Sequence, residues 1–196
     1  MIPFRLASLA VGLAASMLAQ GAAAQAWPTK PIRLVVPFSA GGANDLMARA
    51  AAEGASKQLG QPIIIDNKPG AGAILGADVV AKSAPDGYTF LVSAAGVVSN
   101  SMIKKNMPYK DDALVPVAMI ALAPSVVVVP ANAPYKDLKE FVAASKKSGN
   151  GFHWATAGTG STPHFVEGIL ETKYGGKLDV VPYKSGSESI TAVLGN

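Results

Sequence analysis

Residues 32–45 read IRLVVPFSAGGAND, and this stretch decides the fold. The apolar run Ile32–Val36 is rich in β-branched residues and flanked by prolines, which predicts a short buried strand. A glycine-containing turn leads from it into residues 45–59, where apolar residues recur at helical spacing until Gly60. The stretch therefore predicts a strand, a glycine-rich loop and a helix.

The same alternation continues along the first half of the chain. Strands are expected at 63–66 and 88–92, with a helix at about 74–82 between them. This order predicts an α/β fold with a parallel or mostly parallel sheet covered on both faces. Because ligands bind at the carboxyl ends of such strands, the loops Ser39–Asn44 and Ser93–Asn100 are candidate ligand loops.

Two apolar runs, Leu114–Ala123 and Ser125–Val129, meet at Pro124. No Asn-Gly or Asp-Gly turn joins them, so we expect two consecutive strands that cross between two lobes rather than a hairpin. The domain boundary is therefore placed at Pro124.

This boundary divides the chain into a signal segment at 1–26, lobe 1 at 27–123 and lobe 2 at 124–196. Lobe 2 is expected to continue the alternation of helix and strand. Its expected elements are helices at 137–147 and about 163–174, strands at 153–156 and 179–182, and a final helix ending at Leu194.

The N-terminus has the composition of a cleaved secretory signal. Arg5 precedes an uncharged apolar stretch at 6–18, and the small-residue run 22–24 follows. The apolar stretch is shorter than the roughly 20 residues of a membrane-spanning helix, although an uncleaved anchor stays the alternative. We expect export of the chain and cleavage after Ala24 or Ala26.

The composition excludes several classes of function. The 196-residue chain contains no cysteine, which excludes disulfide frameworks, thiolate nucleophiles and Cys-ligated zinc or iron–sulfur sites. His153 and His164 are its only histidines, so we expect no metal site and no cofactor. The formal net charge of +4 is dispersed along the chain, so no nucleic-acid partner is expected.

The most informative local motif is GTGSTPH at 158–164. Ser161 or Thr162 stands where a helix N-cap is expected, and Pro163 fits the first helical turn. The preceding glycines allow a ligand to approach the backbone, so free N–H groups and the helix dipole would attract a carboxylate or a phosphate. An ordinary capped helix is the alternative.

The loop from Pro37 to Asp45 stands at the matching position in lobe 1. It contains neither a P-loop nor a GxGxxG dinucleotide fingerprint. Asp45 is expected to cap the following helix, and Phe38 either packs against a ligand or closes the turn. Lys184, next to Tyr183, is either a cation for an anionic ligand or an exposed loop lysine.

Nucleophilic catalysis has little support in the sequence. No GxSxG elbow exists, and the only serine near a histidine in sequence is Ser161, three residues before His164. We therefore expect that the protein is not an enzyme. A secreted α/β hydrolase that uses Ser161 and His164 stays open as an alternative, as does a ligand-sensing interaction domain.

Several strings in order resemble one protein family. They are WPTKPIRLVVPF at 27–38, GGAND at 41–45, LGQPIIIDNKPGAG at 59–72, APDGYT at 84–89 and VPYK at 181–184. Together they resemble the Bug, or TctC-like, receptors of tripartite tricarboxylate transporters. The resemblance implies a type II periplasmic binding protein, or Venus-flytrap, with two α/β lobes. It also implies a monomer in the periplasm that binds a small carboxylate, such as a di- or tricarboxylate, without metal or cofactor, and delivers it to a membrane permease.

The resemblance implies which residues line the cleft between the lobes. They belong to three segments: the loop after the first strand, the segment after the third strand and the loop at 158–162. The first and last of these are the glycine-rich loops described above. The expected ligand-binding residues are Phe38, Ser39, Ala40, Gly41, Gly42, Asn44, Ser93, Ala94, Gly96, Gly158, Thr159, Gly160, Ser161, Thr162 and His164.

The chain departs from the family pattern in a few places. Ser39 and Ala40 stand where the family usually has prolines, and Ser185 stands where it usually has glycine. The sequence stops at Asn196, directly after an expected helix, whereas the family continues with another strand and a return crossing into lobe 1. We therefore expect the second lobe to be incomplete.

Overall fold

Lobe 1 is built on a parallel sheet, as expected. The computed structural model describes residues 27–195, and the expected signal segment at 1–26 lies outside them. Strands β1 (Ile32–Val36), β2 (Ile63–Asn67) and β3 (Thr89–Leu91) form a parallel sheet in the order β2-β1-β3. Because β1 is central, Ile32, Val35 and Val36 are buried, whereas Arg33 stays partly exposed and bonds to Asp66 of β2.

Two helices cover this sheet, and a third helix and two short 3-10 turns complete lobe 1. The helices are α2 (Ala43–Leu59), α3 (Ile74–Ala81) and α4 (Gly96–Ile103), and the turns are η2 (Ala71–Ala73) and η3 (Asp111–Ala113). The segment from Ser93 to Asn100 was expected to be a loop, but it becomes helical at Gly96. That expectation was wrong because Ala95, the N-cap of α4, provides no side-chain cap, and the start of the helix therefore has no sequence signal.

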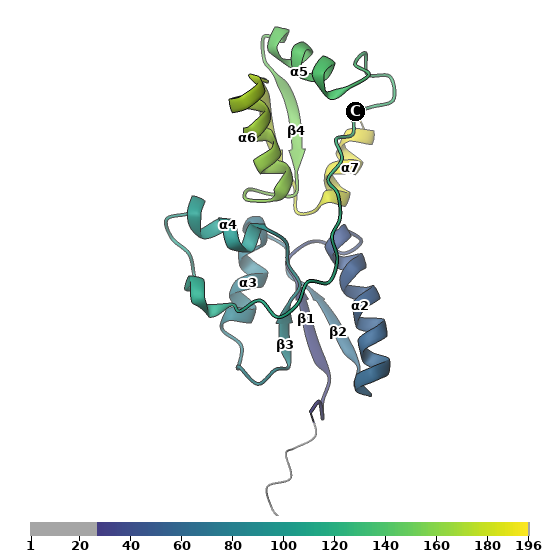
Figure 1. Ribbon diagram of the computed structural model, residues 1–196, viewed down its shortest axis with the longest axis vertical. Coiled ribbons are helices and arrows are strands. Elements are labelled where there is room, and N and C mark those ends of the chain that lie inside the picture. Colours follow the sequence, from purple (N-terminus) through teal and green to yellow (C-terminus); the bar gives the residue numbers. More distant parts are fainter. Residues whose placement is uncertain (1–26, 196) are drawn as a thin grey trace, which may run out of the picture.

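Lobe 2 contains a second, smaller parallel sheet. It pairs β4 (Phe152–Thr156) with β5 (Leu178–Pro182), and the helices α5 (Leu138–Lys147), α6 (Thr162–Tyr174) and α7 (Gly186–Leu194) surround it. In Figure 1 this lobe stands above lobe 1, with the carboxyl ends of both sheets turned toward the junction. The structure is therefore α/β in both lobes.

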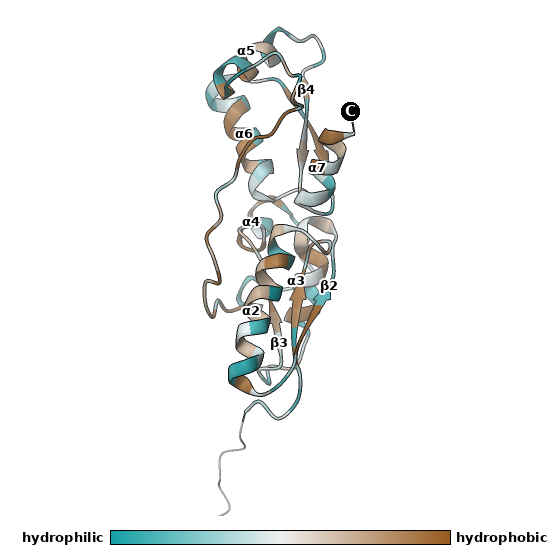
Figure 2. Cartoon of the chain, turned by 90° about the vertical axis from the view of Figure 1, so that its right-hand side faces the viewer, coloured by the Kyte–Doolittle hydropathy of each residue, from teal (hydrophilic) through white to brown (hydrophobic). Residues whose placement is uncertain are grey.

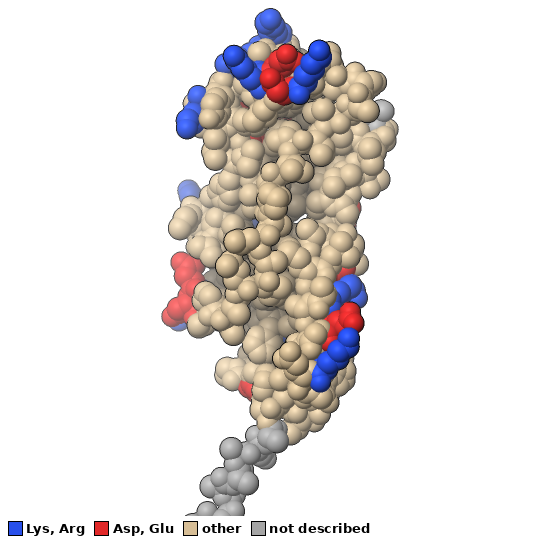
Figure 3. Space-filling model, turned by 45° about the vertical axis from the view of Figure 1, so that its right-hand side comes forward, with Lys and Arg blue, Asp and Glu red and all other residues tan. Residues whose placement is uncertain are grey.

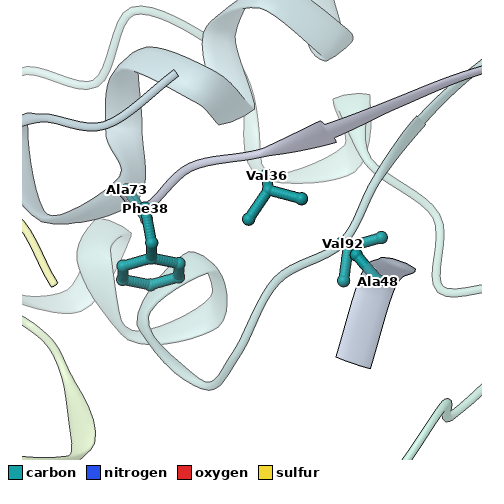
Figure 4. Close-up of a cluster of buried hydrophobic side chains, with 5 residues drawn as sticks. All are labelled: Val36, Phe38, Ala48, Ala73 and Val92. Atoms are coloured by element: carbon teal, nitrogen blue, oxygen red, sulfur yellow. The ribbon is translucent and has the colours of Figure 1, made fainter. Parts of the chain in front are cut away.

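Each lobe has its own hydrophobic core. Figure 4 shows the cluster in lobe 1, which consists of Val36, Phe38, Ala48, Ala73 and Val92. The core of lobe 2 is aromatic and comprises Phe141, Val142, Trp154, Leu170 and Leu178, with Tyr135, Phe152 and Val166 packed against them. Two separate clusters agree with two lobes that fold around independent sheets.

The segment from 114 to 130 crosses from lobe 1 to lobe 2 without forming a strand (Figure 1). The two expected strands at 114–123 and 125–129 are therefore wrong. A strand needs backbone partners, and no strand within residues 27–195 pairs with this segment. Its side chains stay exposed, with 84% of Leu122 and 78% of Val126 accessible, and Figure 2 shows the segment as a brown, apolar trace along one side of the molecule. The boundary at Pro124 stays a prediction.

Asp45 fixes the loop between β1 and α2. Its carboxylate accepts hydrogen bonds from the Gly41 N–H at 2.9 Å, from Arg49 Nε at 2.9 Å and from Asn67 Nδ2 at 3.0 Å. Only 1% of Asp45 is exposed. It was expected to cap the helix, but the N-cap of α2 is Gly42, and no side chain caps the helix there; Asp45 instead accepts the Gly41 N–H, which lies before the helix. The hydrogen bond from Arg49, which outweighs the opposing effect of burial, lowers the pKa of Asp45 to about 2.

None of the helices within residues 27–195 is both long and apolar enough to cross a membrane. Charged side chains on the face in Figure 3 gather over α5 and on the flanks of lobe 1, and uncharged side chains fill the middle.

Two helical glycines provide a matched test of the packing in lobe 1. A Cβ at Gly76 in α3 would lie 2.6 Å from Pro37 Cβ, whereas a Cβ at Gly54 in α2 would meet nothing within 4 Å. We expect Gly76→Ala to lower the free energy of unfolding by about 1–3 kcal/mol through overpacking. Gly54→Ala should raise it by about 0.5–1 kcal/mol because alanine favours the helix. Urea denaturation measures both, and equal effects would contradict the close packing of α3 on the end of β1.

Asp45 should make the stability depend on acid pH. Its pKa is about 2 in the folded chain, against 3.8 for a free side chain, so its contribution is complete above about pH 4 and is lost as the pH falls toward 2. Asp45→Asn should cost about 1–2 kcal/mol at pH 7, a value reduced because Arg49 is half exposed. The variant should then lose less stability than the wild type between pH 4 and pH 2 in denaturant titrations. The exposed pair Glu53–Lys57 offers the control, since Glu53→Gln should change stability by less than about 0.5 kcal/mol.

Candidate functional site

The loops at the carboxyl ends of the two sheets enclose a cavity between the lobes. Its volume is about 320 Å³, which lies at the small end of the range for ligand pockets. Lobe 1 contributes the end of β1, the loop after β2 and the end of α4, and lobe 2 contributes the loops after β4 and β5. The lining residues are Pro37, Gly70, Ala71, Gly72, Ala73, Lys104, Ala157, Gly158, Thr159, Pro182, Tyr183 and Lys184.

The loop from Gly70 to Ala73 has an unusual backbone. All four residues have a positive φ, including Ala71 at 51° and Ala73 at 77°. Each alanine in this region costs roughly 1–2 kcal/mol, so the surrounding contacts must hold the conformation. Asn100 Nδ2 donates to the Gly72 carbonyl at 2.7 Å, and Lys104 Nζ donates to the Ala71 carbonyl at 3.1 Å. Helix α4 therefore fixes this loop at the cavity.

The backbones of the two lobes meet at glycines. A Cβ built on Gly72 would lie 2.0 Å from the Thr159 carbonyl oxygen, and one on Gly96 would lie 3.0 Å from the Gly160 carbonyl oxygen. Ser99 Oγ donates a hydrogen bond to that same Gly160 carbonyl at 3.2 Å. The approach of the lobes therefore depends on the absence of side chains at these positions.

A side-chain hydrogen bond joins the lobes on the other side of the cavity. Ser39 Oγ donates to Glu188 Oε1 at 2.6 Å, and Glu188 Oε2 accepts the Lys184 N–H at 3.1 Å. The hydrogen bond from Ser39 is the main cause that lowers the pKa of Glu188. Glu188 thus ties the loop after β5 to the loop after β1.

The loop before α6 uses most of its own donors. The Gly158 N–H donates to Thr156 Oγ1 at 3.3 Å, the Gly160 N–H to His164 Nδ1 at 3.0 Å and the Ser161 N–H to the Gly158 carbonyl at 3.1 Å. The sequence predicted free N–H groups along this loop, and these three are engaged internally. The reason is that Gly158 and Gly160, at φ of 103° and 85°, fold the loop back on itself.

Ser161 stands at the N-cap of α6, as expected, but its side chain does not cap the helix. Its hydroxyl is buried and has no hydrogen-bond partner among the described residues. A buried hydroxyl without a partner is costly, so Ser161 Oγ is an unsatisfied polar atom at the N-terminus of α6.

The geometry of Ser161 and His164 differs from that of a nucleophile and its base. No hydrogen bond joins Ser161 Oγ to the imidazole within the described chain. His164 Nδ1 is engaged as an acceptor of the Gly160 N–H, which leaves the proton of a neutral ring on Nε2. In this arrangement His164 stabilises the loop before α6 and does not activate the serine.

Few of the expected site residues line the cavity. Gly158 and Thr159 do so. Phe38 is 9% exposed and packs in the core of lobe 1. The Gly41 N–H donates a hydrogen bond to Asp45. A Cβ built on Gly42 would lie 3.6 Å from Ser185 Cβ. The remaining expected residues lie outside the lining and keep their ligand role as a prediction: Ser39, Ala40, Asn44, Ser93, Ala94, Gly96, Gly160, Ser161, Thr162 and His164.

Sequence reasoning missed the contribution of the loop from Gly70 to Ala73. The string NKPGAG at 67–72 entered the sequence analysis only as part of the family resemblance, although glycines that follow a predicted strand are a signal for a turn at the end of that strand. It also missed Lys104, because the helix that carries this lysine was not predicted.

The charged side chains that line the cavity are all positive. Its lining contains Lys104 and Lys184 and, within the described chain, no aspartate, glutamate or histidine. The described residues include no cluster of three or more groups able to hold a metal ion. Backbone groups, hydroxyls and two ammonium groups therefore supply the chemistry of the site, which suits an anion.

Known proteins share this architecture. A family model described as "Tripartite tricarboxylate transporter family receptor" matches residues 47–196. A UPF0065 protein of Bordetella pertussis is 37% identical over 194 residues, covering 98% of this chain and 60% of that protein.

Two solved structures from Rhodopseudomonas palustris are also similar. One, with adipate, has a TM-score of 0.80 and 30% identity over 85% of this chain and 56% of its own. MatC, with bound malate, has a TM-score of 0.78 and 32% identity over 85% of this chain and 57% of its own. The chain thus spans less than two thirds of the length of each of these proteins, and it belongs to the tripartite tricarboxylate transporter receptor family.

Proposed function

We propose that this chain binds a small carboxylate between its two lobes, as the ligand-binding part of a periplasmic solute receptor. The observation that carries the proposal is the cavity of about 320 Å³, closed by loops from both sheets and lined by two lysines without an acidic residue. Adipate and malate in the related structures support this ligand class. Lobe 1 at 27–123 and lobe 2 at 124–196 are the two halves of the receptor.

The same proposal assigns a location and a partner. Residues 1–26 direct export and are removed, and the closed, ligand-bound receptor delivers its carboxylate to the membrane permease of a tripartite transporter. The family supports this role, because its receptors serve such transporters. Alternation between an open and a closed arrangement of the lobes supplies the signal that the permease reads.

Two alternatives make different predictions. A hydrolase requires Ser161 to attack and His164 to accept its proton, and the present geometry provides no hydrogen bond between the two side chains. A ligand-sensing domain shares the cavity but serves a membrane partner other than a permease. Deletion of the gene would then leave carboxylate uptake intact.

Titration calorimetry of the chain with adipate, malate, benzoate and glutamate tests the proposal. We expect at least one small carboxylate to bind with 1:1 stoichiometry and no turnover. Hydrolysis of an ester or amide that Ser161→Ala abolishes, without binding of any of these anions, would overturn it.

Two glycines with the same backbone angle test whether binding needs the approach of the lobes. Gly72 and Gly60 both have φ of 66°, but a Cβ at Gly72 collides with the Thr159 carbonyl, whereas one at Gly60 meets nothing within 4 Å. Alanine at either position carries the same backbone strain of roughly 1–2 kcal/mol. We expect Gly72→Ala to weaken carboxylate binding at least tenfold and Gly60→Ala to change it less than twofold. Equal affinities in calorimetry would show that the ligand does not need this contact.

A further inference from the structure

We propose that Ser39 and Glu188 form a latch that holds the two lobes together before any ligand binds. The inference rests on the proposed function, since it assigns how the arrangement of the lobes around the ligand cavity is regulated. Neither residue lines the cavity, so their contact does not need a ligand.

Few polar contacts join the lobes. Within residues 27–195 the lobes share two hydrogen bonds and no salt bridge. One hydrogen bond runs from Ser39 Oγ to Glu188 Oε1 at 2.6 Å, and the other runs from Ser99 Oγ to the Gly160 carbonyl at 3.2 Å. How much each bond favours contact depends on the partners that its groups would keep if the lobes separated.

The two serine hydroxyls differ in these alternatives. Ser99 Oγ also bonds to the Ala95 and Gly96 carbonyls at the start of its own helix, at 3.2 and 3.4 Å, so it stays paired without lobe 2. Ser39 Oγ and Glu188 Oε1 have no other partner in the described chain. A hydrogen bond from a hydroxyl to a carboxylate is also roughly twice as strong as a neutral one. The bond between Ser39 and Glu188 is therefore the one whose loss should release the lobes.

The start of α7 prepares Glu188 for this contact. Ser185 is the N-cap of the helix, and its hydroxyl accepts the Glu188 N–H at 3.3 Å. In return, Glu188 Oε2 accepts the Lys184 N–H at 3.1 Å. This reciprocal pattern is similar to a capping box, and it holds the carboxylate in place from within lobe 2. Little side-chain entropy is then lost when the Ser39 hydroxyl binds the remaining oxygen.

The latch also lies where two helices begin. A Cβ built on Gly42, the N-cap of α2, would lie 3.6 Å from Cβ of Ser185, the N-cap of α7. The N-terminal ends of the two helices therefore meet, and Figure 1 shows α7 standing above α2. Helix N-termini carry partial positive charge. Glu188, in the first turn of α7 and bonded to the loop before α2, supplies a negative charge that favours this approach.

Distances between labels on α2 and α7 in the ligand-free chain test the latch. The chain contains no cysteine, so Lys57→Cys and Thr191→Cys, at two exposed positions, attach one spin label to each helix. Pulsed electron paramagnetic resonance should give one main distance with Ser39 present. Ser39→Ala should add a population of longer distances and lower the ratio of joined to separated lobes about three- to tenfold. Saturating adipate or malate should restore the distances seen with Ser39.

Three further variants separate the latch from a general loss of contact. Ser39→Thr keeps the hydroxyl and should keep the wild-type distances. Adding Ser39→Ala to Glu188→Ala should cause no further change, because the hydroxyl has then already lost its acceptor. Ser99→Ala is the matched control and should shift the ratio less than twofold. Thermal melts confirm that each labelled variant stays folded.

The outcomes distinguish the two proposals. If Ser39→Ala leaves the distances of the ligand-free chain unchanged, or if Ser99→Ala shifts them as far, the latch is overturned whether or not a carboxylate binds. A labelled chain whose lobes are mainly separated with Ser39 present would overturn it too. If Ser39→Ala separates the lobes but neither adipate nor malate binds, the latch stands and the carboxylate proposal fails.

Discussion

The site depends on a steric constraint: two backbones must approach each other at Gly72 and Thr159 without a side chain between them. Alanine at 72 would place its Cβ 2.0 Å from the opposing carbonyl oxygen, closer than atoms can pack. The loop around it is strained, and Asn100 and Lys104 of α4 keep it in position. The cavity, its charge and the contact between the lobes all follow from holding this loop against lobe 2.

The regular strands and helices could be predicted from the sequence because the signals for each element lie within or next to that element. A buried β-branched run such as Ile32–Val36 and a helix that ends at Gly60 have signals within a few residues. Helix α4 lacks such a signal, since Ala95 provides no cap. The crossing segment has the composition of strands but finds no backbone partner in the described chain, and composition alone cannot reveal that.

The sequence indicated some of the loops that meet at the cavity, but it did not indicate the loop from Gly70 to Ala73 or the side chains that line the cavity. The position of the ligand loops follows from a topological rule on the carboxyl ends of parallel strands. That rule does not say which hydrogen-bond donors stay unpaired, because this depends on contacts that form only in the folded chain. The Gly160 N–H was expected to face a ligand and instead bonds His164, and Phe38 closes the core of lobe 1. Lys104 enters the site only because α4 folds across the strained loop.

The lining of the cavity suits reversible binding of an anion, which is the role that we propose for this chain. Reversible capture needs attraction that is strong when the lobes are together and weak when they are apart, and no covalent step. Ser39 Oγ donates to Glu188 Oε1 at 2.6 Å across the lobes, so this hydrogen bond stabilises the arrangement in which the lobes are in contact. Because a lysine of each lobe lines the same cavity, an anion between them attracts both lobes. Under the proposed function, the charge of a bound anion would therefore add to the contacts that hold the two lobes together.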